Sequence, residues 1–124
     1  MAKGDCYEAN ARWIWLNNNK PDINEYTLVH GVAIGQKGTE IENMEFGHCW
    51  IEKGEMIFDH SNNRNISVPK VLYYAIGQIF EMQKKYKFYR YKLSDIIKFM
   101  MKTKNWGPWE GYFPNLKNKL RVKK

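Results

Sequence analysis

The sequence of 124 residues lacks any apolar run of about 18 residues, the length typical of a membrane span, so no membrane-spanning helix is expected. The first residues, Met1 to Asp5, contain no apolar signal region, and we therefore expect a cytoplasmic rather than a secreted protein. Cysteine is scarce, with Cys6 and Cys49 only. In a cytoplasmic protein two such cysteines are expected to be free thiols rather than a disulfide.

The chain also lacks internal repeats and low-complexity linkers, and it is short for two domains. Its composition is 44% hydrophobic and 15% aromatic, which is typical of a folded domain and not of a disordered chain. We therefore expect one compact domain over residues 1–124, in which residues from about 103 to 124 form a basic aromatic tail.

Positive charge is concentrated in the last third of the chain. Residues 1–80 carry 7 Lys and Arg against 10 Asp and Glu, a net charge of −3, whereas residues 81–124 carry 13 against 3, a net charge of +10. This asymmetry is typical of a protein that binds an acidic partner or nucleic acid, but a solvated face with a basic tail explains it equally well. The aromatic segment 105–114 would either stack bases or fold back on the core, and we favour the second.

The spacing of apolar residues predicts three helices. The first begins after Asp5, an N-cap residue followed by Glu8 at the position of a capping box, and it ends before the run of asparagines at 17–19. The second covers about 69–85, starting at Pro69, and the third about 94–102, starting at Ser94. The side chains expected to face the core are Cys6, Ala9, Trp13 and Leu16, then Leu72, Ala75, Ile76, Ile79, Phe80 and Gln83, and finally Ile96, Ile97, Met100 and Met101.

Runs rich in β-branched and aromatic residues predict strands at 25–34, 46–52, 55–59 and 87–93. These elements together indicate an α+β fold, in which an N-terminal helix carrying Cys6 packs on a small antiparallel sheet of about three to four strands with two further helices. The middle two strands form a hairpin around Lys53-Gly54. With that loop, His48 lies directly opposite Asp59, as a catalytic base and the group that orients it should.

The position of Cys6 has two explanations that the sequence leaves open. At the start of a helix its sulfur lies near unpaired backbone N–H groups and the positive end of the helix dipole, which favours the reactive thiolate. Free cysteines are also among the most buried residues, so Cys6 can equally be a small core residue.

Several other residues are candidates for contact with a substrate. His30 lies in the middle of an apolar strand and is a second candidate base, although such a histidine is more often a core residue. Asn62 and Arg64 directly follow the hairpin, where ordinary turn chemistry explains an asparagine as well as substrate contact does. Trp50 and Trp109 complete the set of side chains expected to bind the substrate.

A metal site is a weaker hypothesis. The residue types that suit zinc are present, but no close pair of them has the C-x₂-C or H-x₃-H spacing of a structural zinc site. We therefore expect no metal and no other cofactor. The candidate ligands are Cys6, His30, His48, Cys49, Asp59 and His60.

The hairpin also carries a resemblance. Gly47-His48-Cys49-Trp50-Ile51-Glu52, followed by Ile57-Phe58-Asp59-His60-Ser61, resembles the His-Ala-Trp-Val-Glu … Val-Asp-Thr signature of transglutaminase-like proteins. That superfamily includes arylamine N-acetyltransferases and several thiol peptidases and amidases of the wider papain-like group. The resemblance covers roughly residues 5–61, and the short chain looks similar to a compact bacterial or phage member of the superfamily.

The resemblance implies an enzyme with the triad Cys6, His48 and Asp59, which would act as a cysteine-dependent hydrolase or acyltransferase on an amide, ester or thioester carbonyl. The backbone N–H of Cys6 or Tyr7 would stabilise the oxyanion. The substrate would be a protein, a peptide or a small acyl compound. The alternative is a non-enzymatic protein that binds nucleic acid or another polyanion through residues 81–124.

Overall fold

The computed structural model describes residues 5–80 and 87–110, and within them the chain forms one antiparallel sheet and three α-helices. The sheet has five strands in the order β4-β3-β2-β1-β5. This arrangement confirms the expected α+β class, with one more strand than expected at the β4 edge. The strands are β1 (Thr27–Ile34), β2 (Glu45–Lys53), β3 (Met56–Asp59), β4 (Ile66–Pro69) and β5 (Tyr89–Tyr91), and the helices are α1 (Cys6–Leu16), α2 (Lys70–Ile76) and α3 (Leu93–Thr103).

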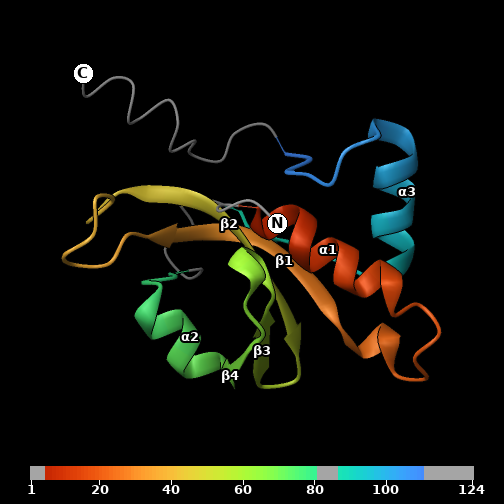
Figure 1. Ribbon diagram of the computed structural model, residues 1–124, viewed down its shortest axis with the longest axis horizontal. Coiled ribbons are helices and arrows are strands. Elements are labelled where there is room, and N and C mark those ends of the chain that lie inside the picture. The colour runs from red at the N-terminus through yellow and green to blue at the C-terminus, as the bar shows by residue number, and fades with distance from the viewer. Residues whose placement is uncertain (1–4, 81–86, 111–124) are drawn as a thin grey trace.

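The sheet separates two hydrophobic layers (Figure 1). Helices α1 and α3 lie over one face and α2 lies over the other. Successive residues of a strand point to opposite faces, so Cys49 and Ile51 contact the α1 layer while Trp50 between them packs in the α2 layer. None of the helices in the described part of the chain is long and apolar enough to cross a membrane.

Helix α1 starts and ends where expected, but its first turn is not held by a capping box. Asp5 makes no side-chain cap bond. Its Oδ1 instead accepts a hydrogen bond from the backbone N–H of Asn62 at 3.4 Å, in the loop after β3. Cys6 and Ala9 are buried and Trp13 packs against the core, as expected, but Leu16 is 69% exposed and the polar Asn10 is fully buried.

Helix α2 presents a different face from the expected one. Leu72, Ile76 and Phe80 are each about half exposed, whereas Tyr73 and Tyr74 pack against Trp50. The physical reason is that each of these tyrosine rings is apolar while its hydroxyl reaches a buried carboxylate. The helix ends at Ile76. The predicted continuation to residue 85 falls in part on 81–86, outside the described residues.

Helix α3 begins one residue before the expected cap. Its N-cap is Lys92, whose backbone N–H donates to the Asp95 carboxylate at 2.9 Å. Ile96 is fully buried as expected, but Ile97 and Met101 are exposed, and Phe99 packs against the core in their place.

The segment after α3 folds back on the core, as favoured from the sequence. Trp106 lies edge-on to Trp15 at 5.6 Å between ring centroids, and Trp109 stacks on Phe99 at 5.1 Å. Tyr112, which the base-stacking alternative also used, lies outside the described residues.

A glycine in β1 makes room for the large ring at the centre of the α2 layer. Gly31 pairs with His48 across the sheet, and a Cβ added at Gly31 would lie 2.8 Å from Trp50 Cη2 and 2.9 Å from the Phe88 ring. Carbon atoms cannot approach so closely, so either ring would have to move.

We expect Gly31→Ala to lower the free energy of unfolding by about 1–3 kcal/mol, since overpacking of a core costs that much. Urea unfolding followed by tryptophan fluorescence measures it. The control is Ser67→Ala on the exposed side of β4, which should change the same quantity by less than about 0.5 kcal/mol. Equal stability of the two variants would show that the space beside Trp50 is not limiting.

Candidate active site

The hairpin that carries His48 and Asp59 has a different register from the predicted one. Lys53 pairs with Met56, so the two-residue turn is Gly54-Glu55 rather than Lys53-Gly54. Gly54 takes a φ of +59°, which a residue without a Cβ adopts easily. The predicted direct opposition of His48 and Asp59 is therefore wrong. Extended by one position beyond the pair Ile51–Phe58, the observed register puts Asp59 opposite Trp50.

The shift nevertheless leaves both side chains on the same face of the sheet. Moving the turn by one residue changes each partner by two positions, and the side-chain period of a strand is also two. His48 and Asp59 thus remain diagonal neighbours on the α2 face, with His48 Nε2 3.6 Å from Asp59 Oδ2.

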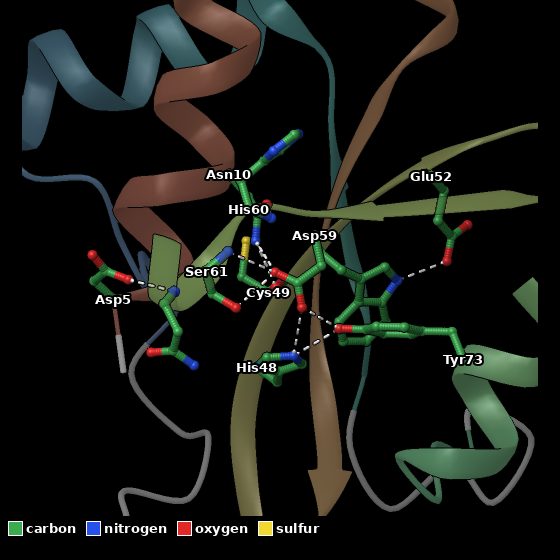
Figure 2. A network of polar contacts seen from close by, with 11 residues as sticks. Asp5, Asn10, His48, Cys49, Glu52, Asp59, His60, Ser61 and Tyr73 are labelled. Atoms are coloured by element: carbon green, nitrogen blue, oxygen red, sulfur yellow. Dashed lines mark hydrogen bonds and ion pairs between the residues drawn. The ribbon is translucent and has the colours of Figure 1, made fainter. Parts of the chain in front are cut away.

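A tyrosine bridges the histidine and the carboxylate (Figure 2). The Tyr73 hydroxyl lies 2.8 Å from His48 Nε2, and it donates to Asp59 Oδ2 at 2.7 Å. These two distances are shorter than the direct separation of His48 and Asp59 and lie within the normal hydrogen-bond range. The sequence pattern did not identify Tyr73 as a candidate site residue, so this contact is a feature that the structure adds.

The second oxygen of Asp59 is also fully engaged. Its Oδ1 accepts hydrogen bonds from Asn10 Nδ2 at 3.1 Å, from the Ser61 backbone N–H at 3.0 Å and from Ser61 Oγ at 2.8 Å. Burial by itself raises the pKa of Asp59, but the charge of the neighbouring His48, with hydrogen bonds from Ser61 and Tyr73, holds that pKa well below its usual range. Asp59 is therefore a carboxylate at any physiological pH.

Cys6 is the third member of the predicted triad, and its influence on His48 is electrostatic. Burial by itself lowers the pKa of His48, but the charges of Cys6 and of the nearby Asp59 raise that pKa to about 10. The contacts of His48 with Tyr73 and with Asp59 are both made by Nε2 and not by the second ring nitrogen, Nδ1. Cys6 is the first residue of α1 and is 6% exposed.

Asn10 connects the helix that carries Cys6 to the hairpin that carries the other two residues. It is fully buried one turn after Cys6, and its Nδ2 donates to the Cys49 carbonyl at 2.9 Å as well as to Asp59. Its Oδ1 accepts the His60 backbone N–H at 2.8 Å. The sequence interpretation overlooked this residue, although an asparagine flanked by Ala9 and Ala11 on a helix is the available signal.

His30, the second candidate base, makes its polar contacts elsewhere. It is fully buried, and its Nδ1 lies 2.9 Å and 3.0 Å from the two carboxylate oxygens of Glu110. Its ring packs edge-on against Tyr7 and stacks on Trp109. Through Glu110 and Trp109, His30 connects the segment after α3 to β1. This is the structural role that is more common for a histidine in the middle of an apolar strand.

The predicted substrate-binding residues divide into two groups. Trp50 is fully buried and donates its indole N–H to Glu52 at 2.9 Å, and Trp109 packs between Phe99 and His30, so both belong to the hydrophobic layers. Asn62 and Arg64 are exposed in the loop that follows Asp59. A substrate contact from these two stays a prediction.

The other cysteine is not placed as a nucleophile. Cys49 is fully buried, and burial raises the pKa of its thiol well above its ordinary value. Both cysteines are free, as expected. Within residues 5–80 and 87–110 no three His, Cys, Asp or Glu side chains lie close enough to hold a metal ion.

Comparisons with known proteins add no relative. No family model matches the chain, and neither the curated proteins nor the solved structures contain a significant match. The resemblance to transglutaminase-like proteins therefore stays a prediction that rests on the hairpin and Cys6. The alternative, polyanion binding through residues 81–124, also stays a prediction, and much of that segment lies outside the described residues.

We expect Asn10→Ala to lower the free energy of unfolding by about 1–3 kcal/mol, because it leaves buried hydrogen-bonding groups of Asp59, Cys49 and His60 without this partner. The matched control is Asn18→Ala in the same region of the chain, whose side chain donates to the Trp15 carbonyl at an exposed position. It should cost no more than about 0.5 kcal/mol. If chemical unfolding gives the same loss of unfolding free energy for both variants, the hydrogen bonds of Asn10 do not stabilise the fold.

The charge on His48 can be tested by titration. Nuclear magnetic resonance of the His48 ring should show the protonated form at neutral pH and a midpoint near 10. Cys6→Ala removes a negative charge, so the midpoint should fall by about 1–3 pH units. Cys49→Ala, which alters the other thiol, is the control and should leave it unchanged. An equal shift in both variants would mean that Cys6 is not the partner of His48.

Proposed function

We propose that this protein is a cysteine-dependent hydrolase or acyltransferase that acts on an amide, ester or thioester carbonyl. The observation that carries the proposal is that His48 lies 3.6 Å from a buried carboxylate and that its pKa is raised to about 10 by the helix-start Cys6 and by Asp59. A thiolate beside an imidazolium is the reactive form of a cysteine nucleophile. Such a site also needs a third group that orients the imidazole. Asp59 is this group, and its hydrogen bonds with Asn10, Ser61 and Tyr73 fix its carboxylate in one position.

The first half of the reaction forms an acyl-enzyme. The Cys6 thiolate attacks the carbonyl carbon, and the carbonyl oxygen takes up the negative charge. The first N–H groups of α1 have no partner within the helix and lie next to the sulfur, so they are placed to stabilise that charge. His48 then gives its Nδ1 proton to the departing amine, alcohol or thiol as the bond to the carbonyl carbon breaks, which leaves a thioester on Cys6.

The second half releases the acyl group. Water or an acceptor amine attacks the thioester carbonyl, and neutral His48 takes a proton from this nucleophile. The thiolate leaves, the product is a carboxylic acid or an amide, and the thiolate–imidazolium pair is restored. The choice between hydrolysis and transfer depends on which nucleophile reaches the thioester.

Alkylation of Cys6 by iodoacetamide, quantified for each cysteine by mass spectrometry, tests the proposal. Because His48 stabilises the thiolate, the rate should be nearly constant from about pH 6.5 to pH 9, whereas an ordinary thiol with a pKa near 8.5 gains reactivity over that range. His48→Ala should restore the ordinary rise and lower the rate at pH 6.5 by about 10- to 100-fold.

Cys49 in the same samples is the internal control, because it is buried and its thiol is protonated. An ordinary thiol profile for Cys6 in the wild type, unchanged by His48→Ala, would refute the proposal. Hydrolysis of an activated aryl ester, lost in Cys6→Ala and retained in Cys49→Ala, would identify the attacked bond as an acyl bond.

A further inference from the structure

The distances around His48 do not describe a direct histidine–carboxylate hydrogen bond. Nε2 and Asp59 Oδ2 are 3.6 Å apart, longer than the roughly 2.7–3.2 Å of an N–H···O bond. The Tyr73 hydroxyl lies within hydrogen-bond distance of both atoms, at 2.8 Å and 2.7 Å. Figure 2 shows the phenol oxygen pointing at both the His48 ring and the carboxylate from the side of α2.

We propose that Tyr73 is a positioning residue of the site, through which Asp59 holds the His48 ring and its tautomer. The inference rests on the proposed function, since it assigns the orienter of the same triad. It also changes that triad, because the group in contact with Nε2 is then a phenol contributed by α2, and the carboxylate acts through it.

The hydrogen-bond directions decide the tautomer. A phenol has one proton to donate, and the Tyr73 hydroxyl donates it to Asp59, which is ionised and only accepts. The lone pairs of the phenol oxygen then face His48, so Nε2 must carry a proton to make the 2.8 Å contact. When His48 is neutral, its single proton is therefore on Nε2, and Nδ1 is free to take a proton from Cys6 or from the second nucleophile.

The surroundings keep this bridge in place. Burial and the charge of Asp59 raise the pKa of Tyr73 far above its ordinary value, so the phenol stays protonated. The Tyr73 ring is stacked nearly parallel to His48, with an interplanar angle of 14°, and both rings contact the buried Trp50. Within residues 5–80 and 87–110, the titratable groups that act on His48 are Cys6 from α1, Asp59 from β3 and Tyr73 from α2.

The next residue of α2 provides a matched control. Tyr74 also packs against Trp50 and also donates its hydroxyl to a buried carboxylate, but its partner is Glu52 instead of Asp59. Tyr73→Phe and Tyr74→Phe thus each remove one buried hydroxyl from the same helix. Only the first removes a contact to His48.

The experiment is a titration of the His48 ring by nuclear magnetic resonance, with Cys6 alkylation measured on the same proteins. Tyr73→Phe leaves the Nε2 proton without an acceptor within normal range, so the His48 midpoint should fall by about one pH unit or more. The alkylation rate at pH 6.5 should fall by up to about tenfold, because one unit of His48 basicity changes the ratio of thiolate–imidazolium to thiol–imidazole tenfold. Tyr74→Phe should leave both quantities at the wild-type value. If Tyr73→Phe does not fold, 3-fluorotyrosine at position 73 keeps the ring and weakens the oxygen as an acceptor, and it should lower the midpoint in the same direction.

Two results separate this inference from the proposed function. If Tyr73→Phe titrates like the wild type while Asp59→Asn lowers the His48 midpoint, the carboxylate acts directly and the bridge is overturned, although the triad stands. If the alkylation of Cys6 is the same in the wild type and in His48→Ala, the proposed function fails. The His48 midpoint in Tyr73→Phe still decides in that case whether the phenol holds the ring.

Discussion

The buried carboxylate of Asp59 is the interaction on which the rest of the site depends. Its two oxygens receive hydrogen bonds from α1 through Asn10, from the following loop through Ser61 and from α2 through Tyr73, and it lies beside His48 of β2. A carboxylate in a protein interior is costly unless it is paired and hydrogen-bonded, so these groups must all be present together. One charge thereby fixes the relative positions of four segments that are distant in the sequence.

Glu52 of β2 is a second buried carboxylate on the α2 face of the sheet, and it also collects hydrogen bonds from other segments. Glu52 is 7% exposed and receives the Trp50 indole N–H at 2.9 Å and the Tyr74 hydroxyl, with Lys70 at 3.4 Å. Adjacent tyrosines of α2 thus bind two carboxylates of the hairpin. This pairing explains why the helix exposes Leu72 and Ile76 to solvent, since the rotation that satisfies the charges leaves the aliphatic residues outside.

The sequence interpretation was right about the face of the hairpin and wrong about its register. Alternation along a strand is a local property, so His48 and Asp59 were correctly placed on one side. The position of the turn depends on which residue takes a positive φ, and Gly54 can do so at either place of a two-residue loop. In α2 the apolar periodicity predicted the wrong buried face. A tyrosine can be buried when its hydroxyl has a hydrogen-bond acceptor in the core, and the sequence pattern does not show that acceptor.

The sequence by itself determined the α+β class, the helix that begins at Cys6 and the hairpin with its histidine and carboxylate on one face, because periodicity and helix boundaries are encoded by residues that are close in the chain. Only the tertiary structure decided the register, the rotation of α2, and the contacts of Asn10 and Tyr73 with Asp59. These features arise because a buried carboxylate requires hydrogen-bond donors, and the donors to Asp59 come from segments that are distant in the sequence.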